Sequence, residues 1–308
     1  MTARTAPHGP AVRPRAGFTL LEMLAVILII AILVALAFPA YQAVMVNARN
    51  ATVRTEMASL GTAIADFKSK YGLEPPSRIS FVPVSGDLPP TTKAILRKMF
   101  PQIDTTTPAF LASLTQAGLL NEVLVGNEAL VFFLGGVRRN PGATVTTLTD
   151  ELIGFSKNRA NPFAQPGAGQ STRVGPFFEF KSDRLSRNAD DANDSGTVEQ
   201  LVYSDALSTK PYVYASTAAT GKYQDGTTAA TSDFPDLGGT FFKAYRRPDA
   251  TPSTTDNPYW NPSSYQLISA GPDGQLGVGG VYDPKSTGTL DPLDADNLAN
   301  FADGPLGG

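Results

Sequence analysis

The chain has 308 residues, enough for a membrane helix and one or two modest domains. Its formal net charge of -3 gives no indication of a nucleic-acid partner. Cysteine is absent and the single histidine, His8, lies within the first 17 residues. A chain that has no cysteine, and no histidine after residue 17, cannot supply a His-based triad, a cysteine nucleophile or an ordinary zinc site from its remaining residues. Carboxylate-pair chemistry stays open, and packing or ions must hold the fold in place of disulfides.

A long apolar segment lies near the N-terminus. Residues 23–38 contain no polar side chain, and only Glu22 interrupts the run that begins at Leu20. This length is close to the roughly 20 residues that a helix needs to cross about 30 Å of hydrocarbon. Residues 1–17 carry three arginines and no acid, which predicts that they stay in the cytoplasm and that the chain after Pro39 lies outside.

The six residues Gly17-Phe18-Thr19-Leu20-Leu21-Glu22, followed by the apolar segment, resemble the processing signal of type IV prepilins and type II secretion pseudopilins. The resemblance covers about the first 55 residues. It implies cleavage after Gly17 by a prepilin peptidase, methylation of the new amino terminus on Phe18, and a helix kink at Pro39. It also implies an α+β, pilin-like fold, in which a long N-terminal transmembrane helix packs against a small antiparallel β-sheet head with long loops. A simple membrane anchor would need neither the Gly-Phe junction nor the acid.

Glu22 is the one charged residue in the apolar segment, where a charge is unfavourable and is seldom kept without a partner. If cleavage leaves Phe18 with a free ammonium, Glu22 of a neighbouring subunit can neutralise it in a medium of low dielectric constant. That contact would couple subunit addition to the correct axial register. The alternative, that Glu22 reaches the lipid headgroups, is open because the acid lies close to the start of the helix.

Apolar residues continue at helical spacing beyond Pro39 and predict one buried side of a continuing helix: Val53, Met57, Leu60, Ile64, Phe67 and Tyr71. Gly72 and the prolines at 75 and 76 predict its end. The chain is therefore divided into residues 1–17 as a cleaved leader, 18–40 as the transmembrane half of the helix, 41–72 as its second half, 73–264 as an α+β head with a large insertion, and 265–308 as a C-terminal calcium-like loop region.

The head contains several short patterns. Residues 73–110 are rich in Pro, Thr and Ser and are predicted to be a surface insertion with a short helix at 91–99. A second helix is predicted within 108–120, and the apolar run 128–137 fits a buried helix or a strand equally well. Aromatic and β-branched residues predict an antiparallel sheet on the helix, with strands at 176–181, 198–204, 211–216 and 240–245. Long loops are expected at 154–175 and 221–239.

The C-terminal region combines a tight turn with several acids. A predicted strand ends at Ser269 and leads into Gly271-Pro272-Asp273-Gly274. Calcium takes about six to eight oxygen ligands, glycine-rich loops let carbonyls converge, and Asp273, Asp294 and Asp296 offer carboxylates. In a loop-rich region without cysteines, such an ion would be a plausible structural staple.

This region resembles the C-terminal calcium loop of major, G-type pseudopilins of type II secretion. Ser269, Gly271, Asp273, Gly274 and Gly277 match its first half, and Asp296, Leu298, Asn300 and Phe301 approximate its second half. The resemblance implies a structural Ca²⁺ with Ser269, Asp273, Asp294 and Asp296 as ligands. The spacer 278–292 is longer than usual, so Asp283 and Asp291 are competing ligands. The alternative is a metal-free turn with surface aspartates.

These patterns together predict a structural subunit and no enzyme. We expect a single-pass protein of the bacterial inner membrane with its head in the periplasm, assembled through its N-terminal helix into a type II secretion pseudopilus that supports protein export. The expected partners are further copies in a homo-oligomeric filament, other pseudopilins, a prepilin peptidase/methylase, an inner-membrane assembly platform and the membrane. One alternative is a type IV pilus subunit for adhesion, motility or DNA uptake. The other is a membrane-anchored enzyme or glycan-binding module, and an enzyme of the glycosidase type would need two facing acids.

Overall fold

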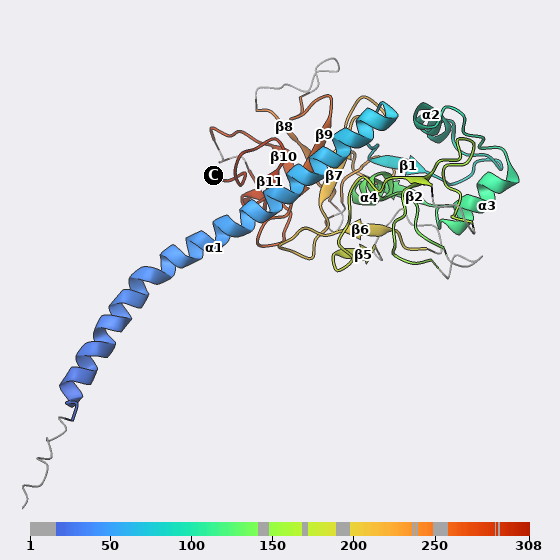
Figure 1. Ribbon diagram of the computed structural model, residues 1–308. Helices are drawn as coiled ribbons and strands as arrows, with labels where there is room; N and C mark the ends of the chain where they lie inside the picture. The colour runs from blue at the N-terminus through green and yellow to red at the C-terminus, as the bar shows by residue number, and fades with distance from the viewer. Residues whose placement is uncertain are drawn as a thin grey trace, which may run out of the picture. The chain divides into compact units, whose positions relative to one another are not determined.

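The computed structural model describes residues 17–140, 148–167, 172–188, 198–235, 237, 240–248, 258–286, 288 and 290–308. The chain divides into two units, residues 1–48 and 49–308. Helix α1 (Leu20–Tyr71, 52 residues) contributes its first half to one unit and its second half to the other (Figure 1). The helix contains Pro39 in its interior. Residues 1–16 of the predicted leader lie outside the described part of the chain.

The apolar half of α1 makes up almost all of the described part of the first unit. Its large apolar side chains are 37–83% exposed, because no other described element of this unit packs against them. The most apolar window of the helix has a mean hydropathy of 3.0, and within the described residues α1 is the one helix long and apolar enough to cross a membrane. In this unit the helix therefore keeps an apolar surface that water does not favour.

The second half of α1 has the opposite character. All six residues of the predicted apolar side are buried: Val53, Met57, Leu60, Ile64, Phe67 and Tyr71. The helix ends where the sequence predicts, since Gly72 has φ +76° and donates its N–H to the Lys68 carbonyl at 2.8 Å. Lys68 and Lys70 lie in the last turn, where positive charge is favoured.

Three short helices and a β-ribbon follow α1. Strand β1 (Arg78–Ser80) pairs antiparallel with β2 (Val123–Val125), and between them in the chain come α2 (Pro90–Met99) and α3 (Pro108–Gln116). Helix α4 (Asn127–Gly135) covers most of the apolar run 128–137, so the helix alternative is the one that the structure adopts, and the helix is buried at every position. The predicted surface insertion at 73–110 is wrong, because its scattered apolar residues Phe81, Leu88 and Leu96 enter the main core.

The remaining strands form small sheets. The pairs β3 (Phe155–Ser156) with β4 (Arg173–Val174) and β5 (Leu185–Arg187) with β6 (Leu201–Tyr203) are antiparallel. A three-stranded antiparallel sheet has the order β11 (Leu298–Ala299), β9 (Tyr265–Ser269), β7 (Val213–Ser216). Strands β8 (Lys243–Arg246) and β10 (Gly279–Val281) pair in parallel. The 3-10 helix η3 (Pro292–Asp294) precedes β11.

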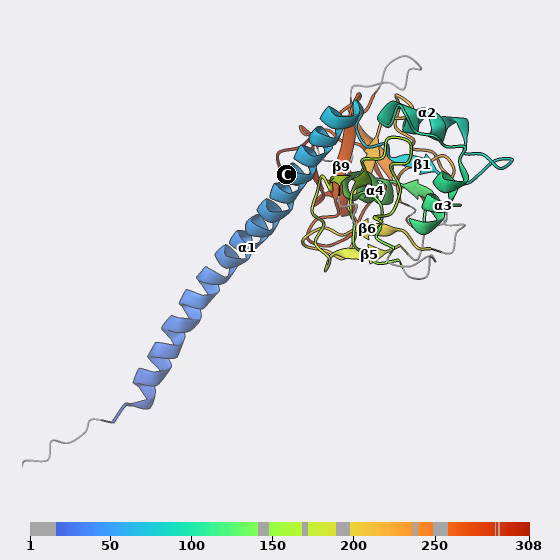
Figure 2. The same cartoon turned by 45° about the vertical axis from the view of Figure 1, so that its right-hand side comes forward.

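The α+β, pilin-like architecture is confirmed, with two differences in detail. The predicted single antiparallel sheet is split, in the described residues, into four antiparallel groups and one parallel pair. Residues 176–181 form no strand, because Phe177, Phe178 and Phe180 pack their rings against the core instead of alternating across a sheet. Both views show β9 beside the second half of α1, where a Cβ on Gly61 would lie 3.1 Å from Tyr265 Oη (Figures 1 and 2).

Candidate functional site

The predicted processing site lies just before α1. Gly17, Phe18 and Thr19 are outside the helix, which begins at Leu20. The Phe18 side chain is 76% exposed, and no heavy atom beyond the neighbouring residues lies within 4 Å of the position of a Cβ on Gly17. The Gly17-Phe18 bond is therefore in non-helical, open backbone, the form in which a peptidase can engage it.

Thr19 and Glu22 form a capping box at the start of α1. The backbone N–H and the hydroxyl of Thr19 both donate to Glu22 Oε2, at 2.8 Å each, and the Glu22 N–H donates to Thr19 Oγ1 at 3.2 Å. No donor from the described part of the chain reaches Glu22 Oε1. This role of Thr19 was missed in the sequence, although the Thr-x-x-Glu spacing before an apolar run is its known signature.

Pro39 lies on an apolar face of α1. The face is formed by Ile27, Ile30, Ala31, Val34, Ala35, Phe38 and Pro39. It contains no charged residue, and two of its residues are alanines. A surface of this kind suits close approach by another apolar helix.

The four predicted calcium ligands do not converge. Ser269 is buried and donates its hydroxyl to Asp205 Oδ2 at 2.6 Å. Asp294 is also buried, and its carboxylate accepts from the backbone N–H groups of Gly277 and Gly279 at 3.0 and 2.9 Å. These contacts turn the Ser269 hydroxyl and the Asp294 carboxylate toward protein donors and acceptors.

Asp273 and Asp296 are the two predicted ligands that lie together. The Asp273 N–H donates to Asp296 Oδ2 at 3.1 Å, and burial together with the charge of Asp273 raises the pKa of Asp296. Of the competing acids, Asp291 caps η3 by accepting from the Leu293 N–H, and Asp283 accepts from the Lys285 N–H.

A calcium ion would relieve the repulsion between Asp273 and Asp296, but the complete set of four does not fit one ion in this arrangement. Within the described ranges no three acidic, histidine or cysteine side chains are grouped closely enough to hold a metal.

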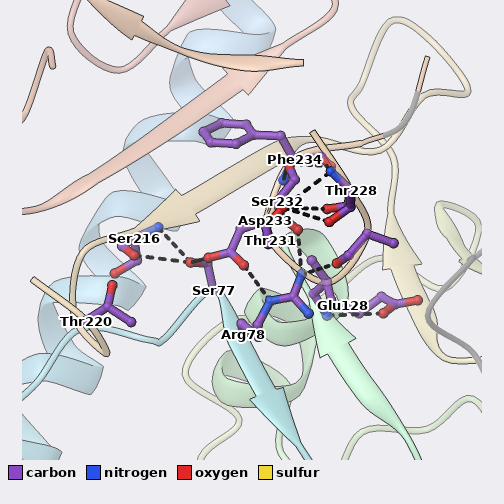
Figure 3. A network of polar contacts seen from close by, with 12 residues as sticks. Ser77, Arg78, Glu128, Ser216, Thr220, Thr228, Thr231, Ser232, Asp233 and Phe234 are labelled. Atoms are coloured by element: carbon purple, nitrogen blue, oxygen red, sulfur yellow. Dashed lines mark hydrogen bonds and ion pairs between the residues drawn. The ribbon is translucent and has the colours of Figure 1, made fainter. Parts of the chain in front are cut away.

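The head also contains a hollow of about 630 Å³, which bears on the enzyme alternative. Its lining includes the acids Glu128 and Asp233. Figure 3 shows Asp233 turned toward Ser77 and Arg78, with Ser77 Oγ at 2.6 Å and Arg78 Nε at 2.8 Å from its carboxylate. Glu128 accepts from Asn188 Nδ2 at 2.9 Å. Both acids thus have structural partners that tie separate segments of the head together.

Comparison with known proteins gave one match. A family model described as the prokaryotic N-terminal methylation motif matches residues 12–38. No curated protein and no solved structure gave a significant match. The matched segment contains Gly17, Phe18 and Glu22, and the apolar half of α1 fits a membrane-anchored protein. The motif implies processing by a prepilin peptidase and assembly into filaments, and it supports a type IV pilin-like family with a structural subunit, rather than an enzyme, as its class.

Proposed function

We propose that this protein is a structural subunit of a type II secretion pseudopilus, which it joins through α1 after cleavage between Gly17 and Phe18. The observation that carries the proposal is the start of α1. There a carboxylate with one oxygen engaged by Thr19 and the other open lies four residues after Phe18, at the head of an exposed apolar helix. The methylation motif covers this same segment.

Assembly uses the two features of this half of the helix in different ways. Before assembly the apolar side chains lie in the membrane. In the filament they pack against other copies of α1, with the apolar face at Pro39 as one place of close approach. The Phe18 ammonium of a neighbouring copy binds Glu22 Oε1. Because ion pairs are strong where water is excluded, a subunit out of register leaves both charges unpaired and is disfavoured.

The sequence of the C-terminal loop favours the secretion pseudopilus over a type IV pilus subunit, since residues 269–277 follow the pseudopilin loop pattern. We propose in addition that calcium binds at Asp273 and Asp296, whose adjoining carboxylates a cation would stabilise. Backbone carbonyls and water would complete the coordination shell. We then expect the assembled filament to support the secretion of proteins and not to form a surface fibre.

The test is to replace Glu22 and follow each step separately. Glu22→Ala and Glu22→Gln should leave membrane insertion and cleavage intact and block incorporation into filaments. Incorporation can be measured by shearing and by cross-links between cysteines introduced on α1, because the chain has no native cysteine to give a background. Asp66→Asn, which removes an exposed acid from the same helix, is the matched control and should assemble normally.

Two results would contradict the proposal. The first is normal filament assembly of Glu22→Ala. The second is a mature protein that still carries residues before Phe18, which mass spectrometry of the N-terminus would reveal.

A further inference from the structure

Asp294 has an unusual environment for an acid. Its side chain is 0% exposed, and a buried carboxylate is costly unless hydrogen bonds satisfy it. Oδ1 accepts from the Gly277 N–H at 3.0 Å and from Asn297 Nδ2 at 2.7 Å, while Oδ2 accepts from the Gly279 N–H at 2.9 Å. Both oxygens therefore face the positive ends of N–H groups, which offset part of the cost of burying the anion.

These hydrogen bonds join segments that belong to different sheets. Gly279 begins β10, which pairs with β8, and Gly277 lies two residues before it. Asn297 directly precedes β11 in the three-stranded sheet. Asn297 extends the connection, because its Nδ2 lies 3.3 Å from Tyr245 Oη on β8 and its carbonyl accepts from the Leu306 N–H at 3.0 Å. One carboxylate thus connects the β8–β10 pair to the sheet that contains β9.

The glycines around Asp294 have a reason that involves no metal. A Cβ on Gly277 would lie 2.7 Å from Asp294 Oδ2, and a Cβ on Gly279 would lie 2.1 Å from the Lys243 carbonyl oxygen. Gly279 also has φ +65°, which side chains rarely adopt. The glycine-rich sequence therefore lets the backbone approach the carboxylate and β8, whereas the sequence pattern alone predicts a loop whose carbonyls converge on calcium.

The orientation of the Asn297 amide also indicates that Asp294 binds no metal. Its Oδ1 is buried and has no hydrogen-bond partner among the described residues, so it is a candidate for an ion ligand. The amide, however, presents its Nδ2 donor to Asp294, and a metal shared by the two side chains would require its oxygen there. From these contacts we infer that Asp294 is the hydrogen-bonding centre that joins the β8–β10 pair to the three-stranded sheet in the C-terminal region. We infer also that it is not a metal ligand.

Thermal unfolding of the full chain in detergent, with calcium or with a chelator, tests this inference. Asp294→Asn places an amide donor against backbone donors, so it should lower Tm by at least about 5 °C, and by the same amount in both buffers. Asp296→Asn is the matched control. It should change Tm little in chelator and should remove any rise that calcium gives the wild type.

Hydrogen exchange of the wild type gives a second readout that needs no variant. The amides of Gly277 and Gly279 should be equally protected with calcium and with chelator, since their acceptor does not change. The inference is overturned if calcium exposes these amides to exchange, or if Asp294→Asn abolishes a calcium-dependent rise in Tm while leaving Tm in chelator unchanged.

The outcomes separate this inference from the proposals for calcium and for assembly. If calcium changes neither Tm nor exchange, the calcium proposal fails, while a calcium-independent loss in Asp294→Asn still supports the role of Asp294. Neither result depends on the contact of Glu22 with a neighbouring subunit.

Discussion

Helix α1 carries two glutamates whose surroundings differ. Glu22, in the first unit, is exposed, and among the described residues its carboxylate is held by Thr19 alone, three residues away. Glu56, in the second unit, has a largely buried side chain that pairs with Arg184, whose Nη1 lies 2.6 Å from Oε2. Two tyrosine hydroxyls also donate to it, from Tyr203 at 2.9 Å and from Tyr212 at 2.7 Å.

The apolar residues of α1 show the same difference. Leu33 is 61% exposed, whereas Leu60 is 0% exposed, although both lie on one continuous helix. In the second half the fold of the subunit itself satisfies both the charge and the apolar surface. In the first half these needs are left for a membrane or for another molecule. The comparison therefore assigns residues 49–71 to folding of the head, and it leaves residues 18–48 as the surface that the proposed assembly would use.

Truncating a leucine in each half should give the largest difference between the two halves of α1. Leu60→Ala should lower the free energy of unfolding of the head by about 2–5 kcal/mol, because it leaves a cavity in the core. Leu33→Ala should leave that unfolding unchanged and should reduce filament incorporation instead. Denaturation of the full chain in detergent can be followed through Trp260, the single tryptophan, which lies in the second unit. An equal loss in the free energy of unfolding from the two substitutions would show that both halves of α1 contribute to the stability of the head.

Neutralising each glutamate tests the same difference between the two halves at the level of charge. Glu56→Gln should cost about 2–3 kcal/mol, because it leaves Arg184 buried without its counter-charge. Glu22→Gln is the matched control and should not alter unfolding of the head. A Glu56→Gln variant as stable as the wild type would mean that Arg184 and the tyrosines find other partners.

The effect of Glu56→Gln should also depend on pH. Burial alone would raise the pKa of Glu56, but hydrogen bonds from Arg184, Tyr212 and Tyr203, with the charge of Arg184, lower it below its ordinary value. The unfolded chain therefore takes up the proton first as pH falls. The stabilisation by Glu56 is fully present above about pH 4.3, the ordinary value, and is lost as pH falls through the lower folded pKa. The difference in the free energy of unfolding between wild type and Glu56→Gln should shrink as pH falls over that range. A difference that stays constant with pH would contradict a charge-based role.

The sequence predicts the features that depend on neighbours in the chain. The buried side of α1 follows from its spacing of three and four, and its end follows from Gly72. The surroundings of Glu56 could not be predicted, since Arg184 and Tyr212 lie 128 and 156 residues further along the chain. The apolar run 128–137 fits a helix or a strand equally well in the sequence, because α4 is buried on all sides and its apolar residues show no periodicity.

The C-terminal acids show where local patterns stop being informative. Their presence in one region was predicted from the sequence, but the partner of each acid was not. Asp294 binds backbone groups 15 and 17 residues away, and Asp296 binds the Asp273 N–H across 23 residues. Which acids can share an ion depends on these longer contacts. The same holds for residues 73–110, whose composition is that of a loop while their apolar side chains complete a core built by distant segments.

The smallest expected effect concerns the one contact that Glu22 makes within its own chain. Thr19→Val keeps the size of the side chain but removes the hydroxyl that caps α1, so it should weaken the start of the helix by about 1 kcal/mol. Thr19→Ser keeps the hydroxyl and is the control. If Thr19 orients the carboxylate toward a neighbouring subunit, Thr19→Val should reduce filament incorporation in the cross-linking assay, and Thr19→Ser should restore it, with cleavage after Gly17 unchanged in both. Full incorporation of Thr19→Val would show that Glu22 finds its partner without the capping box. Glu56 depends on partners in its own chain, and Glu22 would then function without one.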